Sequence, residues 1–445
     1  MNIWGIRIKL KKLFSNEVVR GSFLSLFLKC LATVLGFILN VLITRTLSPS
    51  EAGYFFMAQS LVLILAVISR LGLDQIITKK VASWALANQW LEINRLYAFS
   101  VILVFFSSSM ISFFVYVNSE FIANHFFNKP FLSPVLVAMI ASVIPISLYM
   151  VHGQFFQGLK DMAKFQLSQG LGISAASLFL IGLVFMLTYK VDAILYAQLF
   201  TSSAFLILII MFRFWLKSEF SEFKFGGDLK RVALEALPLW GAASLLVTQQ
   251  WASVLLIGVY GTEQDAAYFS VAHRTSMLAA LFLISVNSIA APKMAAYFFQ
   301  KDFLKLKHLT IWSTRLMVVV SLPVVSILFF FPERVLRLFG DGYVVASKAL
   351  MILAAGQFIN AMSGAVGLLL TMTNNQNIFF WCNLATVCIL LLLSILLIPD
   401  YGTVGSALAY VGALCFQMSI MTYFVYRKLD IIPFYIFQKL PPKFN

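Results

Sequence analysis

Apolar runs of about 20 residues follow one another along the chain, and short polar segments separate them. A helix needs about 20 mostly apolar residues to cross the hydrocarbon core of a bilayer. The pattern therefore predicts an all-α polytopic membrane protein with about 12 transmembrane helices. The predicted spans cover residues 21–44, 52–74, 96–117, 133–153, 167–188, 193–214, 234–259, 266–290, 309–331, 346–370, 377–398 and 402–426.

The composition agrees with a membrane protein. The 445 residues are 61% hydrophobic and only 11% charged, whereas a soluble domain is about 45–50% apolar and about 25% charged. A net charge of +15 would indicate a nucleic-acid partner in a soluble protein. In a membrane protein it marks the cytoplasmic loops, so no nucleic-acid partner is expected. The four cysteines lie in apolar runs without metal-ligand spacing, and they are Cys30, Cys382, Cys388 and Cys415.

The N-terminal segment interleaves basic and apolar residues, which predicts an amphipathic segment at the membrane surface. The apolar run after it is too long for the core of a signal peptide, and it is predicted to be the first span. The predicted organisation is a basic amphipathic segment at 1–20, an N-lobe of spans 1–6 at 21–214, a cytoplasmic linker at 215–232, a C-lobe of spans 7–12 at 233–426 and a cytoplasmic tail at 427–445.

The distribution of basic residues predicts the orientation of the chain. Of the 33 lysines and arginines, four lie within spans away from the span ends, and six lie in or at the edge of segments that are outside if the N-terminus is inside. The remaining 23 then lie in the inner segments. Because cytoplasmic loops are enriched in Lys and Arg, both termini are predicted to be cytoplasmic.

A short sequence repeat relates the two halves of the chain. Residues 51–58 (Glu-Ala-Gly-Tyr-Phe-Phe-Met-Ala) resemble residues 265–272 (Asp-Ala-Ala-Tyr-Phe-Ser-Val-Ala), 214 positions later. Each copy opens the second span of a six-span half. The repeat predicts two pseudo-symmetric six-helix lobes in parallel orientation, related by an axis along the membrane normal.

Polar residues within the predicted spans are the candidates for function, because ionisable groups are costly in a membrane. Lys29 lies about 12 Å into span 1. It shares one helix face with Asn40 and other small or polar residues, and such a face is expected to line a wet cavity. The alternative for Lys29 is that its amine reaches back to the cytoplasmic interface.

Span 2 shows a comparable face with Gln59, Ala66, Arg70 and Asp74. Arg70 and Asp74 are four residues apart and are expected to pair if the span is helical there. The pair is predicted either to contribute to a substrate site and its gating or to act as a structural clamp near the cytoplasmic end.

Spans 7 and 8 carry further candidates. In span 8, His273 and Arg274 align through the repeat with Gln59 and Ser60, and an arginine at this depth needs water or an anion. The alternative for His273 is a hydrogen-bonded packing residue. In span 7, the run Gln249, Gln250 and Trp251 suits sugar binding by amide hydrogen bonds and ring stacking, but it suits helix packing equally well.

The charge balance within the spans favours an anionic substrate. Lys29, Arg70 and Arg274 lie inside spans, whereas no carboxylate lies deep in one. A cavity lined in this way attracts anions, and the arginine fork suits phosphate. The sequence shows no glycine-rich phosphate loop, no HExxH motif and no nucleophile elbow, so no enzyme activity and no cofactor are expected.

Several short motifs resemble those of bacterial polysaccharide flippases of the Wzx type, which share a superfamily with the MATE drug exporters. They are residues 47–55 (Leu-Ser-Pro-Ser-Glu-Ala-Gly-Tyr-Phe), 70–74 (Arg-Leu-Gly-Leu-Asp), 157–161 (Gln-Gly-Leu-Lys-Asp), 286–292 (Val-Asn-Ser-Ile-Ala-Ala-Pro), 331–340 (Phe-Pro-Glu-Arg-Val-Leu-Arg-Leu-Phe-Gly) and 401–409 (Tyr-Gly-Thr-Val-Gly-Ser-Ala-Leu-Ala). Their order and spacing cover nearly the whole chain.

The resemblance implies a MATE-like fold of two six-helix lobes around a central cavity, in a bacterial inner membrane. The implied substrate is an undecaprenyl-pyrophosphate-linked oligosaccharide (an O-antigen, capsule or exopolysaccharide unit), moved from the cytoplasmic to the periplasmic leaflet by alternating access. Related peptidoglycan-precursor flippases place cationic residues on spans 1, 2 and 8, where Lys29, Arg70 and Arg274 fall here.

The resemblance also implies which partners the protein has, and two alternative functions stay open. The expected partners are membrane lipids and the polymerase and glycosyltransferases of the same pathway, and transport is expected to use a proton gradient, a sodium gradient or substrate consumption outside. One alternative is a cation-coupled multidrug exporter of the same fold, and the other is a membrane oligosaccharide polymerase or ligase.

Overall fold

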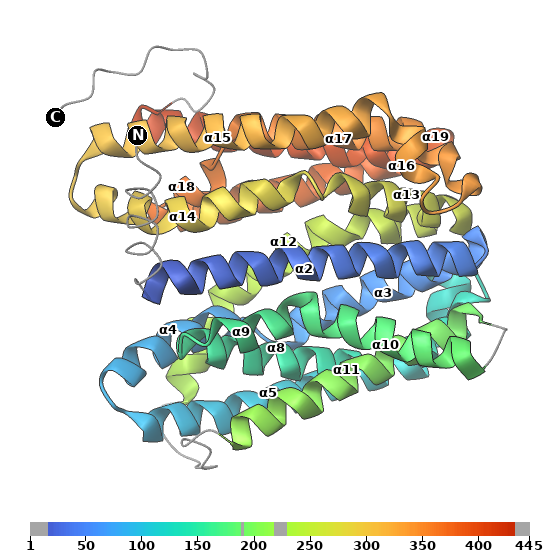
Figure 1. The fold of residues 1–445 in the computed structure, drawn as a ribbon, viewed down its shortest axis with the longest axis horizontal. Coiled ribbons are helices and arrows are strands. Elements are labelled where there is room, and N and C mark those ends of the chain that lie inside the picture. Colours follow the sequence, from blue (N-terminus) through green and yellow to red (C-terminus); the bar gives the residue numbers. More distant parts are fainter. Residues whose placement is uncertain (1–16, 188–190, 218–228, 432–445) are drawn as a thin grey trace, which may run out of the picture. The chain divides into compact units, whose positions relative to one another are not determined.

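The computed structural model describes residues 17–187, 191–217 and 229–431, and this part of the chain is helical, without a β-strand (Figure 1). The expectations for the amphipathic N-terminal segment, the linker and the cytoplasmic tail fall largely outside the described residues. The predicted all-α fold class is confirmed for the part of the chain that the structure describes.

The first half of the chain runs through a series of helices. They are α2 (Glu17–Thr46), α3 (Pro49–Ser69), α4 (Leu73–Leu86), α5 (Trp90–Val117), α6 (Ser119–Phe121), η1 (Ile122–Phe126), α7 (Leu132–Ile140), α8 (Val143–Gly158), α9 (Met162–Gln166), η2 (Leu167–Leu171), α10 (Gly172–Leu187) and α11 (Ala193–Leu216).

The second half continues in the same way. Its helices are α12 (Leu229–Tyr260), α13 (Glu263–Ser276), α14 (Ala280–Phe299), α15 (Phe303–Phe330), α16 (Pro332–Leu336), η3 (Asp341–Ala346), α17 (Ser347–Ser363), α18 (Val366–Met372) and α19 (Gln376–Leu429).

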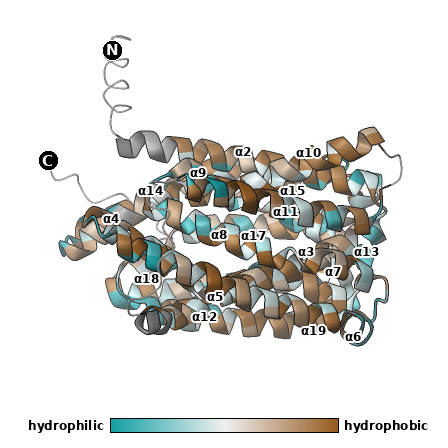
Figure 2. Cartoon of the chain, turned by 90° about the horizontal axis from the view of Figure 1, so that it is seen from below, coloured by the Kyte–Doolittle hydropathy of each residue, from teal (hydrophilic) through white to brown (hydrophobic). Residues whose placement is uncertain are grey.

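Apolar residues predominate along these helices, as expected for a chain whose outer surface faces lipid (Figure 2). Within the described residues, nine helices are long and apolar enough to cross a membrane, or ten if the bent pair α7–α8 forms one span. Helix α19 has 54 residues, about 80 Å at 1.5 Å per residue, and contains the non-helical Gly402, so it supplies two consecutive spans. The pair α13–α14 covers the predicted span 8.

The chain forms two compact units. Unit 1 comprises residues 1–40, 62–122 and 133–243, and unit 2 comprises residues 41–61, 123–132 and 244–445. The units do not follow the sequence halves, because two segments of the first half pack in unit 2 and the start of α12 packs in unit 1. The six-span lobes remain a prediction.

Unit 1 is built around α8, which packs against α4, α5 and α11, while α10 packs against α11 (Figure 1). Its core contains a buried aromatic group, in which Tyr97 stacks on Trp215 with ring centroids 4.1 Å apart. The Tyr97 hydroxyl lies 2.8 Å from Nε2 of the buried His152, whose Nδ1 lies 2.7 Å from the Leu148 carbonyl oxygen. These bonds satisfy polar atoms that would otherwise be costly in the core.

Unit 2 is built around α17, which packs between α15 and α19, while α14 packs on α15 and α18 packs on α19 (Figure 1). One hydrophobic cluster joins α14, α15, α18 and α19 and includes Met294, Met317, Leu369 and Met421. Helix α13 packs on α17 and α19, so the residues of predicted span 8 are held against this core.

The prediction of one continuous helix over residues 52–74 is wrong. Helix α3 ends at Ser69, and Leu71 and Gly72 have φ of 51° and 76° before α4 begins. A Cβ on Gly72 would lie 2.5 Å from the backbone nitrogen of Trp240 in α12. Only glycine fits both the left-handed backbone and this close approach. Asp74 therefore lies beyond the break and does not continue the helix face that carries Gln59.

The repeated sequence marks two equivalent helix starts. Ser48 and Glu51 exchange hydrogen bonds before α3: the Ser48 amide and hydroxyl donate to the Glu51 carboxylate, and the Glu51 amide donates to Ser48 Oγ. Thr262 and Asp265 form the same reciprocal arrangement before α13. The matched acids of the repeat are thus the carboxylates of two capping boxes.

Candidate functional site

Arg274 on α13 lies in an aromatic and amide environment within unit 2. Its Nη2 donates to Gln59 Oε1 at 2.6 Å. The carbon at the centre of the guanidinium lies 4.7 Å from the Phe56 ring centroid and 5.1 Å from the Trp251 ring centroid. Aromatic rings and an amide oxygen both stabilise a cation in a low-dielectric site. The structure thus brings together three predicted site residues, Gln59, Trp251 and Arg274.

Three helices supply this arrangement, which we call the Arg274 site (Phe56, Gln59, Trp251 and Arg274). Phe56 and Gln59 lie one helical turn apart on α3, and Trp251 lies on α12. Both α3 residues are buried, whereas Trp251 and Arg274 are half-buried. The site therefore combines two side chains from the first half of the chain with an aromatic ring and a cation from the second half.

Helices α3 and α13 meet along a line that we call the seam, within unit 2. Gln264 Nε2 donates to Ser50 Oγ at 3.2 Å, and these residues are 214 positions apart, as in the sequence repeat. Gly53 lies against the Glu263 backbone, where a Cβ would be 2.7 Å from the carbonyl carbon. The seam thus joins equivalent helices of the two repeats, as expected for elements close to a pseudo-two-fold axis.

Two basic side chains of the first half add contacts to unit 2. Arg45 Nε donates to the Leu338 carbonyl oxygen at 2.8 Å, and Lys129 Nζ donates to the Gly261 carbonyl oxygen at 2.9 Å. Burial lowers the pKa of Lys129, and the nearby Glu263 and Asp265 partly oppose this shift. Both cations bind carbonyls just beyond helix ends, where positive charge is favourable.

His273 occupies the core of unit 2 rather than a surface. Its ring stacks on Phe269, with centroids 5.5 Å apart, and meets the edge of Tyr410 at 4.8 Å. The residue is fully buried, and neither ring nitrogen has a hydrogen-bond partner within the described part of the chain. Its packing role matches one of the two alternatives from the sequence, although the expected hydrogen bond is not observed among these residues.

Gln249 takes part in a chain of amides rather than in the Arg274 site. Gln249 Nε2 donates to Gln417 Oε1 at 2.8 Å, and Gln417 Nε2 donates to Asn383 Oδ1 at 2.9 Å. These bonds tie α12 to both parts of α19, which is the helix-packing alternative for Gln249. Gln250 is half-buried on the same helix.

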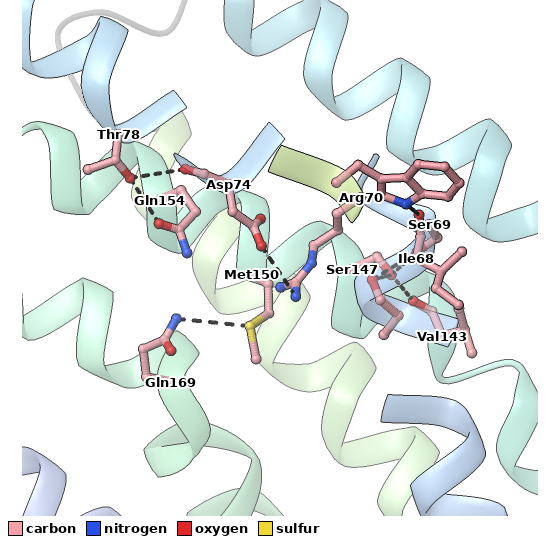
Figure 3. A network of polar contacts seen from close by, with 12 residues as sticks. Ile68, Ser69, Arg70, Asp74, Thr78, Val143, Ser147, Met150, Gln154 and Gln169 are labelled. Carbon is pink, nitrogen blue, oxygen red and sulfur yellow. Dashed lines mark hydrogen bonds and ion pairs between the residues drawn. The ribbon is translucent and has the colours of Figure 1, made fainter. Parts of the chain in front are cut away.

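Arg70 and Asp74 pair within unit 1, as the sequence predicts, although the chain between them is a turn and not a helix. Arg70 Nη2 lies 3.3 Å from Asp74 Oδ2, and the two side chains are 7% and 22% exposed. Figure 3 shows the pair beside Met150 and near the buried Ser69–Ser147 hydrogen bond of 2.7 Å. A pair this well buried is costly to break from one side only.

Further polar side chains continue from this pair along α4 and α8 (Figure 3). Thr78 Oγ1 lies 2.9 Å from Gln154 Oε1 and 3.2 Å from Gln157 Oε1. On η2, Gln169 Nε2 donates to Met150 Sδ at 3.9 Å. Sequence reasoning missed these residues, although three glutamines within and beside an apolar run indicate polar contacts inside a span.

The polar face predicted on span 1 lies on α2 in unit 1. Lys29 is half-buried, and Thr33 Oγ1 donates to its carbonyl oxygen at 3.0 Å. Asn40 Nδ2 donates to the Gly36 carbonyl oxygen at 2.6 Å. These polar side chains satisfy part of their hydrogen bonding within their own helix. Among the described residues, no three His, Cys, Asp or Glu side chains gather to hold a metal ion.

Comparison with known protein families identifies the chain. The family described as "Polysaccharide biosynthesis protein" matches residues 18–298, and the MatE family matches residues 238–396. An uncharacterised membrane protein of Methanocaldococcus jannaschii is 22% identical over 437 residues, covering 94% of this chain and 85% of the relative. The probable low-salt glycan biosynthesis flippase Agl15 of Haloferax volcanii is 26% identical over 160 residues, covering 36% of this chain and 34% of Agl15.

Solved structures show the same fold. An inward-facing multidrug resistance MATE transporter has a TM-score of 0.74 at 14% identity, covering 90% of this chain and 94% of that one. The lipid II flippase MurJ in an inward closed conformation has a TM-score of 0.71 at 16% identity, covering 91% and 87%. The chain therefore belongs to the polysaccharide biosynthesis protein family, as its resemblance to the Wzx-type flippases predicts, and it has the MATE-like fold.

Proposed function

We propose that this protein is a flippase for a lipid-linked oligosaccharide whose lipid and sugar are joined by pyrophosphate. In this proposal the substrate is an undecaprenyl-pyrophosphate-linked repeat unit, which moves from the cytoplasmic to the periplasmic leaflet of a bacterial inner membrane by alternating access. Both termini are then cytoplasmic. The family match and the partial likeness to the flippase Agl15 support the proposal.

The Arg274 site is the observation that carries this proposal. A guanidinium within a predicted span contacts an amide oxygen and two aromatic rings, and these three groups are uncharged. Pyrophosphate oxygens bind an arginine fork more strongly than an amide oxygen does, because both partners are charged. The site is therefore suited to an anionic head group on a lipid-soluble carrier.

The second candidate is a cation-coupled multidrug exporter, because MATE transporters share the fold. A cationic drug is attracted by carboxylates and repelled by an arginine. Asp74, which lies near the end of predicted span 2, is already paired with Arg70. The electrostatics of these named groups therefore favour the anionic substrate over the drug.

A reconstituted vesicle assay tests the proposal. Vesicles carry an undecaprenyl-pyrophosphate-linked sugar, and a membrane-impermeant lectin reports the sugar that reaches the outer leaflet. We expect transfer of the unaltered lipid-linked sugar by the parent protein and no efflux of ethidium. Ethidium efflux without sugar transfer would favour the exporter, and an extended glycan would favour a polymerase.

Arginine variants test the role of the Arg274 site in the same assay. Arg274→Ala should slow transfer roughly ten- to a hundred-fold, because a hydrogen bond to a charged group contributes about 1.5–3 kcal/mol. Arg274→Lys should restore part of the rate, since it keeps the charge and loses the fork. Arg95→Ala is the matched control, because Arg95 pairs with Glu92 on α5 at 2.6 Å. Normal transfer by Arg274→Ala would refute the phosphate-binding role.

The driving force is proposed to be a proton gradient, a sodium gradient or removal of the sugar outside by the polymerase of the pathway. No bound cofactor and no enzyme activity are part of the proposal. Ionophores that collapse each gradient in the vesicles separate these sources. A rate that survives both ionophores would show that neither gradient is needed, and substrate removal would then be the remaining proposed driving force in the cell.

A further inference from the structure

The Arg274–Gln59 hydrogen bond lies at the deep end of the seam between α3 and α13. Ser50, at the start of α3, bonds Gln264 at the start of α13. Gln59 lies nine residues further along α3, which is about 13 Å at 1.5 Å per residue. By the predicted topology, the Ser50 end faces the periplasm. The Gln59 end is therefore the part of the seam nearest the middle of the membrane.

Gln59 occupies a donor that an anionic ligand would also use. Its Oε1 accepts a 2.6 Å hydrogen bond from Arg274 Nη2. A phosphate oxygen that takes this N–H must displace the amide oxygen, since both need the same position on the guanidinium fork. The exchange favours phosphate, because the bond then joins opposite charges in a site lined by Phe56 and Trp251.

The same bond holds two parts of the chain together. Gln59 belongs to the first-half segment 41–61, which packs in unit 2 on second-half residues. Close packing of Gly53 on the Glu263 backbone extends the contact toward the periplasmic end. A ligand that displaces Gln59 from Arg274 therefore removes the deep attachment of the seam and weakens the hold of the remaining rim contacts.

We propose that Gln59 holds the place of the substrate phosphate on Arg274, so that phosphate binding releases α3 from α13 and opens the seam. The inference rests on the proposed flippase function and adds how the substrate controls the periplasmic side. A ligand shifts a conformational equilibrium only through its different affinity for the two states. Here the difference arises because the closed state offers Gln59 as a competitor for Arg274.

The competition also selects the substrate by charge. An uncharged polyprenol or a free neutral sugar forms no stronger hydrogen bond to the guanidinium than the amide oxygen does, because it carries no negative charge. Only a carrier with a phosphate or pyrophosphate group opens the seam. The seam then stays closed when the transporter is empty and opens when the loaded carrier is present.

Cross-linking across the seam tests this coupling. Ser50→Cys and Gln264→Cys are introduced into a variant in which the four native cysteines are replaced, and a short bis-maleimide, which adds one thiol at each end, reports the closed seam. The probe is undecaprenyl pyrophosphate in lipid vesicles, and undecaprenol is the uncharged control. We expect undecaprenyl pyrophosphate to reduce cross-linking several-fold and undecaprenol to leave it unchanged.

Two substitutions at Gln59 distinguish a residue that competes with the ligand for Arg274 from a residue that only packs. Gln59→Leu removes the competitor, so it should lower cross-linking without ligand and should tighten probe binding roughly tenfold or more. Gln59→Glu supplies a charged competitor, so it should keep the seam cross-linked and weaken probe binding. A residue that only packs would give the same direction of change for both substitutions, and that result would overturn the proposal.

Gln417→Leu is the matched control. It removes a buried amide of unit 2 whose partners, Gln249 and Asn383, lie within the second half and not across the seam. Its cross-linking and probe response should equal those of the parent. Equal cross-linking in Gln59→Leu and in this control would also contradict the proposal.

Probe binding is measured separately, by a ligand-induced shift of thermal unfolding. It distinguishes a failure of the Gln59 placeholder role from a failure of the phosphate site itself. If undecaprenyl pyrophosphate binds and the seam stays closed, the placeholder role is wrong and the flippase function stands. If the parent and Gln59→Leu both fail to bind it, the phosphate site itself is wrong, and the proposed function falls with it.

Discussion

Gly53 offers a direct way to open the seam without touching the Arg274 site. A Cβ at this position would lie 2.7 Å from the carbonyl carbon of Glu263 and closer to its oxygen, whereas ordinary contact begins at 3.4 Å. Both obstacles are backbone atoms, so no side-chain rotation relieves the clash. Gly53→Ala therefore requires the two helices to separate by about 1 Å or more, which costs about 1–3 kcal/mol.

This cost shifts the equilibrium between the closed and open seam. A change of about 1–3 kcal/mol lowers the closed population relative to the open one roughly 5- to 150-fold. The hydrogen bonds of Ser50 and Gln59, which flank Gly53 on α3, should weaken together with the contact. Fold stability should change little, because alanine favours a helix interior by about 0.5–1 kcal/mol relative to glycine.

The assay is cross-linking of Ser50→Cys to Gln264→Cys, with Gly182→Ala as the matched control. Gly182 lies within α10, and a Cβ there meets no atom within 4 Å. We expect cross-linking to fall in Gly53→Ala and to remain at the parent level in Gly182→Ala. Parent-level cross-linking in a correctly folded Gly53→Ala protein would show that the seam does not depend on this close approach.

Two further predictions concern stability, measured by thermal unfolding in detergent. Arg70→Ala should destabilise unit 1 by about 3–5 kcal/mol, because it leaves the largely buried Asp74 charge without its ion pair, and adding Asp74→Ala should recover part of the loss; additive losses would mean that the pair is not coupled. Gln249→Leu should lower the free energy of unfolding by about 1–3 kcal/mol, because it leaves Gln417 without one partner. Sugar transfer should be unchanged at equal protein levels. A transfer defect in this variant would indicate that Gln249 belongs to the substrate site.

The membrane spans could be predicted because a span depends on the summed hydropathy of a run of residues and not on their exact order. About 20 apolar residues in a row predict a span whatever their order, so the helices of the structure fall where the apolar runs do. The break at Leu71 and Gly72 was not predicted, and it lies against α12, whose contacting residues are more than 160 positions away in the sequence. A left-handed turn of this kind depends on tertiary contact, and a glycine is the one sequence feature that indicates it.

The roles of the polar residues were harder to predict than their positions. Gln59 and Gln249 are the same residue type in similar apolar runs, yet Gln59 meets Arg274 and Gln249 meets Gln417. Helical spacing defines which residues share a face, but the rotation of each helix decides what the face meets. Phe56 was missed for the same reason, since an apolar residue within a span carries no sign of a neighbouring cation.

The seam also shows where the two repeats stop being equivalent. Offsets of 214 relate Ser50 to Gln264, and these residues contact each other. The symmetry mate of the Gln59–Arg274 contact would join Ser60 to His273, but Ser60 donates to the Phe56 carbonyl oxygen, and His273 packs against Phe269 and Tyr410. Arg274 of the second half is therefore matched in the first half by the uncharged Ser60. Two cations facing each other there would repel in the closed state, whereas one cation opposite an amide closes the seam and still attracts a phosphate.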